Sequence, residues 1–197
     1  MKQSEIRITQ ASVNCVIFCG DKTLLMHRSE TKEVDPGVYN VLGGKVQKDE
    51  DFISAAIREA REETGDKNGT YINPECMTYC GTFRFQGGYE KDWTAQFFVF
   101  EVADEEFPGE IEHEEGVLEW VSKKDVPGIE KVIWDLPYCW TEILDNELRF
   151  SIVAELSAPA VCESLRKSVL HEHGGLLYQE YYEKTDAGLE LVEVIQN

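Results

Sequence analysis

One stretch of the chain, residues 51–64, constrains the fold most, because it predicts a helix with an apolar stripe and an acidic stripe side by side. Its apolar residues recur at the period of a helix, so one face must lie on a core. Glu59, Glu62 and Glu63 fall within about a 100° arc beside that face, just before the C-cap expected at Gly65. The apolar face consists of Ile53, Ala56, Ile57, Ala60 and Thr64.

Three carboxylates at the end of a helix are unfavourable unless something balances their charge. Each like-charge pair at i, i+3 or i+4 costs about 0.2–0.5 kcal/mol, and the negative end of the helix adds to the repulsion. A hard divalent cation removes both costs, and Mg²⁺ prefers one or two carboxylates together with waters and phosphate oxygens. The alternative is a solvated acidic face on which Arg58 and Glu62 form an ordinary i, i+4 pair.

The residues before this helix favour the metal-binding interpretation. Gly44 is followed after five residues by Glu50, and after seven more by Arg58-Glu59-Ala60-Arg61-Glu62-Glu63-Thr64-Gly65. This spacing resembles the signature of the Nudix family, G-x5-E-x7-R-E-U-x-E-E-x-G-U, in which U is a bulky aliphatic residue. Every fixed position outside the U sites matches. Two U sites depart from the pattern, because Ala60 is small and Asp66 is polar.

The resemblance implies an α+β fold, the Nudix-type αβα sandwich with a mixed β-sheet, over roughly residues 6–156. It also implies a site for Mg²⁺, or for Mn²⁺ in its place, with Arg58 and Glu50 orienting the ligands. The cation would neutralise phosphate charge and activate water, so the implied reaction is hydrolysis of a phosphoanhydride by in-line attack. The implied metal ligands are Glu59, Glu62, Glu63 and the Gly44 carbonyl.

Outside this signature, the chain resembles the oxidised-purine nucleoside triphosphatases of the family, the mutator-type diphosphatases. In them, the asparagine matching Asn40 hydrogen-bonds the base; the alternative is that Asn40 only ends a turn. A carboxylate in their late acidic loop, best matched by Glu115, adds a metal ligand or acts as general base. Solvated loop charge is the alternative there, because Glu112 and Glu114 compete for the role.

Trp134-Asp135 resembles the tryptophan and acid that stack on and read the purine in these enzymes. The acids of the family stand slightly further along, where this chain has Leu136-Pro137, and a plain core position is the alternative for Trp134. Arg28 and Lys45 are either ligands of phosphate oxygens or surface cations.

The expected substrate is therefore a (deoxy)nucleoside triphosphate, with 8-oxo-dGTP as a candidate, which is split into the monophosphate and pyrophosphate. ADP-ribose, other nucleotide sugars and dinucleoside polyphosphates are alternatives, because enzymes for them differ in residues outside the signature. A Nudix-fold regulatory module without catalysis is a further alternative. Such modules usually lose the signature glutamates, whereas this chain keeps Glu59, Glu62 and Glu63.

The composition indicates which partners and which cellular compartment to expect. The formal net charge is −19, so the chain repels phosphate backbones and a nucleic-acid polymer is not an expected partner. No long apolar run predicts a membrane helix, and the charged residues 1–7 do not resemble a secretory signal. We therefore expect a cytoplasmic protein with ordinary buried thiols. A zinc site shared by Cys15/Cys19 and Cys76/Cys80 is the alternative for four of the six cysteines.

Strand and turn patterns fill most of the remaining chain. Residues 76–86 and 94–102 are rich in aromatic and β-branched residues and predict an antiparallel pair. Residues 136–145 suit a short helix, and residues 147–156 a last strand.

We assign residues 1–156 to the Nudix domain and residues 157–197 to a C-terminal extension. In this extension, residues 160–171 suggest a helix, and residues 176–184 with 189–195 a hairpin. The extension either packs on the domain or lies in a homodimer interface.

Overall fold

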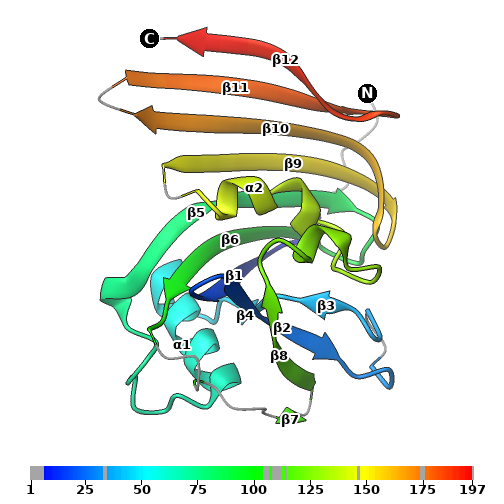
Figure 1. Cartoon of the computed structure of the whole chain (residues 1–197). Coiled ribbons are helices and arrows are strands. Elements are labelled where there is room, and N and C mark those ends of the chain that lie inside the picture. The colour runs from blue at the N-terminus through cyan, green and yellow to red at the C-terminus, as the bar shows by residue number, and fades with distance from the viewer. Residues whose placement is uncertain are drawn as a thin grey trace.

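The computed structural model describes residues 7–32, 35–103, 107, 112–113, 115–145, 147–173 and 176–196. Within these residues, twelve strands form one sheet, which Figure 1 shows. The strands are β1 (Thr9–Cys19), β2 (Lys22–Arg28), β3 (Tyr39–Asn40), β4 (Leu42–Lys45), β5 (Met77–Gly87), β6 (Asp92–Glu101), β7 (Glu112–His113), β8 (Gly116–Ser122), β9 (Leu148–Ala158), β10 (Val161–His173), β11 (Leu176–Thr185) and β12 (Gly188–Gln196). The helices are α1 (Phe52–Thr64), α2 (Trp140–Ile143) and single 3-10 turns at Pro74–Cys76, Val126–Gly128 and Leu136–Tyr138.

The sheet is mixed, as the sequence predicts. Neighbouring strands run in the order β12-β11-β10-β9-β5-β6-β1-β2-β8-β7, while β3 pairs with β2 and β4 with β1. β1 pairs in parallel with β6, and β5 with β9, whereas β5 and β6 form the expected antiparallel pair. In β4, Gly43 and Gly44 pair with Asn14 and Val13 of β1, so the glycine pair is anchored to a strand in the middle of the sheet.

The helix α1 begins and ends where the sequence predicts. The Asp51 side chain accepts a hydrogen bond from the Ser54 N–H at 2.9 Å and so caps the N-terminus. Gly65 has φ 71°, the left-handed conformation in which glycine commonly ends a helix, and its N–H donates to the Glu62 carbonyl.

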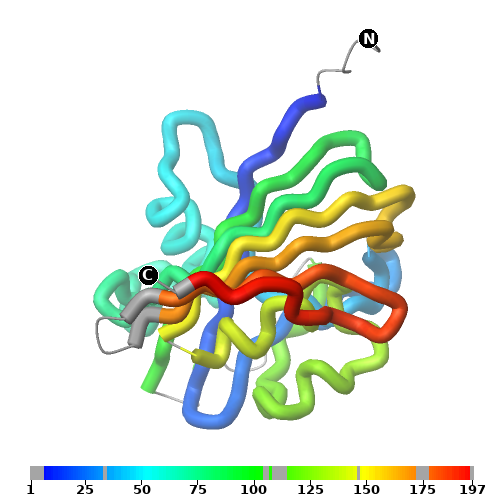
Figure 2. The backbone as a smooth tube through the Cα atoms, turned by 90° about the horizontal axis from the view of Figure 1, so that it is seen from above, coloured from blue at the N-terminus to red at the C-terminus, as the bar shows by residue number. Residues whose placement is uncertain are grey.

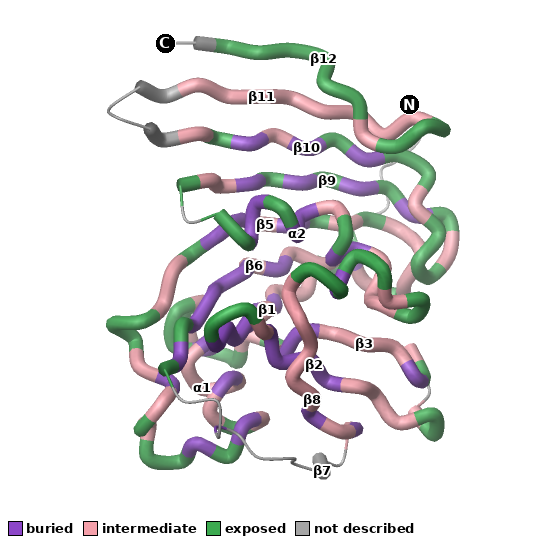
Figure 3. Tube along the Cα trace, in the orientation of Figure 1, coloured by how far each residue is buried: buried purple, intermediate pink, exposed green. Residues whose placement is uncertain are grey.

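Helices cover both faces of the sheet, which gives the expected αβα arrangement. On one face, Val13 and Cys15 of β1 share a core cluster with the alanines of α1. On the other face, Val16 and Phe18 share a second cluster with apolar residues of α2. Successive side chains of a strand point to opposite faces, so one strand feeds both layers. Figure 3 shows buried residues concentrated in these central elements.

The helix expected over residues 160–171 is wrong, because this segment is the strand β10. Leu165, Lys167 and Val169 are all buried, and the residues between them face outward or lie half-buried, which is the alternation of a strand. Leu165 and Val169 stand four residues apart, a spacing that keeps two residues on one face of either a helix or a strand. Pairing with β9 and with β11 decides between the two.

The hairpin expected after this segment is confirmed as β11 and β12, whose pairing ends at Thr185 and Gly188. Figure 2 shows β9, β10, β11 and β12 following one another across the sheet. The strand β9 crosses the expected boundary between residues 156 and 157. The division of the chain into residues 1–156 and 157–197 stays a prediction, and the sheet runs through it without a break.

The strand β12 forms one edge of the described sheet. Its apolar side chains are exposed on both faces, since the successive and regularly paired residues Val194 and Ile195 are 47% and 39% accessible. Leu191 and Val192, at an irregular point of the pairing with β11, are 52% and 55% accessible. Glu190 and Glu193 are exposed among them.

The cysteines are free thiols, and four of them are buried. Cys15 and Cys19 belong to the core cluster on the α1 face, whereas Cys80 belongs to the cluster on the opposite face. The zinc alternative is therefore wrong, because its two halves lie on different sides of the sheet. None of the helices in the described residues is long and apolar enough to cross a membrane.

Candidate active site

The acidic end of α1 lies against the glycine pair of β4. A Cβ atom on Gly44 would approach the carboxylate carbon of Glu59 to 2.5 Å, so the missing side chain leaves the space that this carboxylate occupies. Glu63 accepts a hydrogen bond from the Gly43 N–H at 2.7 Å. Gly43 has φ 144°, a conformation that L side chains rarely adopt. Two of the three predicted helix acids thus meet the two glycines of the signature.

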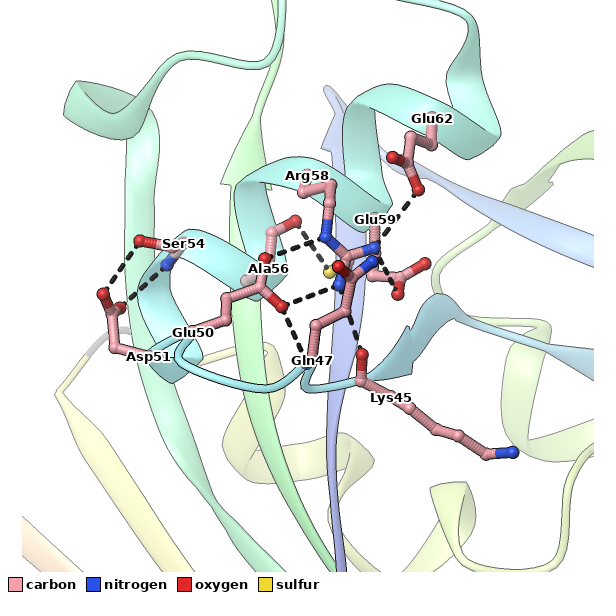
Figure 4. A network of polar contacts seen from close by, with 10 residues as sticks. Lys45, Gln47, Glu50, Asp51, Ser54, Ala56, Arg58, Glu59 and Glu62 are labelled. Atoms are coloured by element: carbon pink, nitrogen blue, oxygen red, sulfur yellow. Dashed lines mark hydrogen bonds and ion pairs between the residues drawn. The ribbon is translucent and has the colours of Figure 1, made fainter.

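Arg58 is the centre of a network of ion pairs, which Figure 4 shows from close by. Its Nε and Nη2 donate to the two carboxylate oxygens of Glu50, each at 2.8 Å. Its Nη1 donates to Glu59 at 2.7 Å and to Glu62 at 3.2 Å, and its Nη2 also donates to the Lys45 carbonyl at 3.2 Å. The hydrogen bonds from Arg58 lower the pKa of Glu50 to about 2. One guanidinium therefore ties α1 to β4 and to the loop between them.

Glu63 is the most buried acid of this group. Burial raises the pKa of Glu63 to about 8; the Gly43 N–H and Arg28 oppose this shift, and the charges of Glu59 and Glu115 add to it. Burial and the neighbouring carboxylates disfavour the charged form of Glu63, whereas a cation bound beside Glu63 would favour that charged form.

Arg28 and Glu115 bring the end of β2 and the start of β8 to the same place. The Arg28 Nη1 donates to the Glu115 carboxylate at 3.0 Å, and the Ser29 N–H donates to the Glu115 carbonyl at 2.8 Å. The Arg28 Nε is buried without a hydrogen-bond partner in the described part of the chain. Of the competing acids, Glu114 lies outside the described residues, and Glu112 is described by its backbone alone.

Glu62 differs from the other two acids of α1. Its side chain is 61% exposed and pairs with Arg58. Among the residues that the structure describes, no group of three or more histidine, cysteine, aspartate or glutamate side chains is arranged to hold a metal ion. Arg58 donates to both Glu59 and Glu62 and so offsets their charges.

A cleft of about 570 Å³ opens beside the glycine pair. All the predicted substrate-binding residues line it, together with two of the predicted metal ligands: Arg28, Asn40, Gly44, Lys45, Glu115, Trp134 and Asp135. Arg58 and Glu62 line a different hollow along α1, so the structure does not bring all the predicted site residues into one cavity.

Trp134 and Asp135 form a wall of this cleft just before the 3-10 turn Leu136–Tyr138. The Trp134 ring lies edge-on to Phe83 and Phe85, with ring centroids 5.5 and 5.7 Å apart, so it borders both core and cleft. One carboxylate oxygen of Asp135 and the amide oxygen of Asn40 are buried without hydrogen-bond partners within the described residues. Burial raises the pKa of Asp135 to about 6, to which the charge of Asp35 contributes.

Sequence reasoning missed several other residues of the cleft, among them Asp35, Phe85, Tyr89 and Trp93. Phe85 and Trp93 are directly paired across β5 and β6, and their rings stack with centroids 6.2 Å apart. The Lys45 ammonium lies 5.9 Å from the centre of the Trp93 ring. The alternation of side chains along strands could have predicted that Phe85 and Trp93 lie on one face of the sheet. It could not have predicted that Lys45 lies beside them.

Asp66, which departs from the signature, has a structural role of its own. Its carboxylate accepts hydrogen bonds from the N–H groups of Thr70, Tyr71 and Ile72 at 2.8, 2.9 and 2.8 Å. Arg61 donates twice to the Ile72 carbonyl, at 3.1 and 2.9 Å. The signature has an aliphatic residue at this position after α1. Here the buried carboxylate of Asp66 fixes the following loop by hydrogen bonds instead.

Comparison with known proteins agrees with this geometry. The family model described as the NUDIX domain matches residues 8–138. A Bacillus subtilis (strain 168) protein named as the uncharacterized Nudix hydrolase YvcI is 30% identical over 122 residues, which are 61% of this chain and 70% of that protein.

Solved structures of two MutT proteins share the fold. The one from Bacillus halodurans is 21% identical, with 80% of this chain and 97% of that chain covered and a TM-score of 0.64. The one from Methanosarcina mazei Go1 is 26% identical, with 70% and 94% covered and a TM-score of 0.57.

A mixed sheet between helices, with a glutamate-rich helix end against a glycine pair, is the arrangement of a Nudix-type domain. The chain belongs to the Nudix family. It is a hydrolase acting on nucleoside diphosphates linked to another group, and Nudix hydrolases generally use a divalent metal. The regulatory alternative is therefore not supported.

Proposed function

We propose that the protein hydrolyses a (deoxy)nucleoside triphosphate, with 8-oxo-dGTP as a candidate, to the monophosphate and pyrophosphate in the presence of Mg²⁺. One observation carries this proposal. A single cleft joins the glycine pair, which contacts Glu59 and Glu63, to the aromatic ring of Trp134 and the buried carboxyl of Asp135. A nucleoside triphosphate needs an acidic site, which holds the metal for its phosphates, and a neighbouring aromatic site for its base. The Methanosarcina mazei relative is named MutT, which supports this substrate class.

The residues beside the glycine pair fit Mg²⁺. Carboxylate and carbonyl oxygens are the hard ligands that this ion prefers, and it needs only one or two protein carboxylates beside water and phosphate. Glu59 occupies the space above Gly44, and Glu63 is a buried carboxyl whose charge a cation would balance. The residues that would hold the ion are Glu59, Glu63, Glu115, the Gly44 carbonyl and, from its exposed position, Glu62. When bound, Mg²⁺ would neutralise phosphate charge and lower the pKa of water.

The other polar residues of the site hold groups in place. Arg58 and Glu50 fix the Glu59 carboxylate against β4, so that it does not swing toward solvent. Arg28 and Lys45 offer cationic donors to phosphate oxygens from the wall of the cleft. Together these contacts would orient the phosphate chain for in-line attack, which supplies much of the catalysis in phosphoryl transfer.

The base would lie on Trp134, because a flat ring gives stacking energy that does not depend on the phosphates. Asn40 and Asp135 each offer a buried acceptor oxygen that lacks a partner in the described residues. Buried polar atoms are nearly always hydrogen-bonded, so these two favour a ligand edge that carries N–H donors, as guanine and 8-oxoguanine do.

A second candidate substrate class is a dinucleoside polyphosphate or a nucleotide sugar such as ADP-ribose. The observation that favours it is the second aromatic surface of the cleft, formed by Trp93 and Phe85 beside Lys45. A second base could stack there and its adjoining phosphate could meet the lysine.

One assay separates the candidates. The purified protein is incubated with Mg²⁺ and dGTP, 8-oxo-dGTP, the other nucleoside triphosphates, ADP-ribose and a dinucleoside tetraphosphate, and pyrophosphate and orthophosphate release are scored. We expect pyrophosphate from a triphosphate, with the highest kcat/KM for a purine. Faster cleavage of ADP-ribose or the dinucleotide than of any triphosphate would overturn the proposal in favour of the second class.

We also propose that the protein acts in the cytoplasm on free nucleotides. The formal net charge of −19 supports nucleotides rather than nucleic-acid polymers as partners, because it repels a polyanion. Residues 157–197 are the candidate surface of a homodimer, and sedimentation velocity would decide between monomer and dimer.

A further inference from the structure

A buried cation of the C-terminal extension contacts the segment that follows the wall of the cleft. Lys167 of β10 has a side chain that is only 8% exposed, and its ammonium lies 2.7 Å from the Glu142 carboxylate of α2, which is 7% exposed. The same ammonium donates a hydrogen bond to the Tyr138 carbonyl at 3.0 Å. A buried charge requires both a counter-ion and hydrogen bonds, and Lys167 finds them in one short segment, residues 138–142.

This segment continues directly from the base wall of the cleft. Trp134 and Asp135 line the cleft, and the 3-10 turn that follows them ends at Tyr138. The Tyr138 N–H donates to the Asp135 carbonyl at 3.1 Å, and the Tyr138 and Trp134 rings lie edge to face with centroids 6.5 Å apart. A shift of the Tyr138 carbonyl therefore moves both the carboxyl and the ring that face the cleft.

Lys167 is itself held from the far side by a polar chain in β10 and β11. Its ammonium lies 5.4 Å from the centre of the Tyr182 ring. The Tyr182 hydroxyl donates to Glu180 at 2.7 Å, and Glu180 lies 2.9 Å from His171, whose ring stacks on Tyr178. Tyr182, whose hydroxyl is held by Glu180, thus supports the lysine side chain from β11, in addition to its contacts with Glu142 and Tyr138.

We propose that Lys167 is a positioning residue that sets the place of Trp134 and Asp135, and that β10, beyond the matched family region, thereby supports binding of the base in the cleft. The family match ends at residue 138, so β10 supplies a support that the matched residues do not contain. The inference rests on the proposed function, because it takes Trp134 and Asp135 as the base-binding wall. Within the described residues, no hydrogen bond or ion pair joins Lys167 to Gly43 or Gly44 at the phosphate end of the cleft.

The test compares a ligand that has a base with one that lacks it. Lys167→Met removes the charge and the donor, Lys167→Arg keeps both, and Lys184→Met is the matched control. Lys184 belongs to the same extension and donates to the Cys162 carbonyl at 2.9 Å, but this contact stays within the extension. Calorimetric titration gives the Kd of a non-hydrolysable purine nucleoside triphosphate and of inorganic triphosphate, each with Mg²⁺.

For Lys167→Met we expect about a tenfold higher Kd for the nucleotide and an unchanged Kd for inorganic triphosphate, since misplacement by about 1 Å can cost up to roughly 10²-fold in a site. Lys167→Arg should restore nucleotide affinity, and Lys184→Met should leave both constants as in the natural protein. Equal weakening of both ligands, or no change in either, would overturn the proposal. If Lys167→Met does not fold, Lys167→Gln, which keeps a donor for Tyr138, is judged by the same two constants.

Failure of the proposed function gives a different result. In that case the natural protein binds the nucleotide no better than inorganic triphosphate, before any substitution is made. The positioning role is then judged by acrylamide quenching of Trp134 in a background where Trp93, Trp120 and Trp140 are phenylalanine. Lys167→Met should increase that quenching, whereas equal quenching with and without the substitution refutes the positioning role.

Discussion

At the scale of single residues, Arg58 keeps the acidic helix end in order before a cation arrives. Its guanidinium contacts Glu50, Glu59, Glu62 and the Lys45 carbonyl at once. A cation that takes Glu59 and Glu62 must therefore compete with Arg58, which retains Glu50 as a partner. Because two hydrogen bonds join Arg58 to Glu50, Arg58 would keep this partner if a cation took the other two acids.

The first prediction concerns Glu62. Glu62→Gln should abolish measurable turnover with Mg²⁺, because it removes the charge of an acid that we assign to the metal. The fold should persist, because this side chain is 61% exposed and an exposed ion pair contributes little to stability. The measurements are pyrophosphate release and the thermal midpoint by circular dichroism. Glu75→Gln, an exposed acid outside the site, is the control, and full activity of Glu62→Gln would refute the assignment.

At the scale of elements, the loop after α1 depends on one carboxylate. Asp66→Ala should lower the free energy of unfolding by about 2–4 kcal/mol, because three N–H groups lose their common acceptor and part of this loop is buried. Urea denaturation measures the change, and the exposed neighbour Asn68→Ala should shift it by less than about 0.5 kcal/mol. If Asp66→Ala also lowered the free energy of unfolding by less than about 0.5 kcal/mol, the loop would not depend on the Asp66 carboxylate.

The elements differ in how far the sequence predicts them. The helix α1 was predictable because its cap and its terminal glycine agree with its apolar period, and Ala56, Ala60 and Thr64 of the predicted apolar face are buried. Ile53 was wrongly placed on that face, because it is 54% exposed in the first turn. The strand β10 was not, because a four-residue spacing of Leu165 and Val169 fits both periods and only pairing with β9 and β11 resolves it. In the site, the spacing of the signature predicts that Glu59 and Glu63 meet the glycine pair. No spacing predicts the positions of Trp93 and Lys167, because tertiary contacts alone bring Trp93 to the cleft and Lys167 to the turn beside it.

At the scale of the whole molecule, a buried acid in the cleft lowers stability at neutral pH. Burial raises the pKa of Asp135 from 3.8 to about 6. Between these values the folded protein binds more protons than the unfolded chain, so the contribution of Asp135 to stability falls as pH rises through about 6. Such a raised pKa is expected where a site keeps a polar group for a ligand rather than for folding.

Asp135→Asn should therefore raise the free energy of unfolding at pH 7 by about 1–3 kcal/mol and should leave it nearly unchanged at pH 4. Urea denaturation across pH 4 to 8 gives the difference between the two proteins. Because Asp35 keeps its own raised pKa, part of the pH dependence should remain in the variant. A constant difference at every pH would show that Asp135 does not titrate in this window.

The exposed edge strand β12 has a consequence for how copies of the molecule meet. Within the described sheet β12 pairs on one side only, so its outer backbone groups and the side chains of Leu191 and Val192 offer a template onto which another extended chain could add. Glu190 and Glu193 place like charges along that template, so two approaching edges repel one another in most registers. The same two acids would then act as gatekeepers against fibrous aggregation, and colloidal stability in concentrated solution would depend on them.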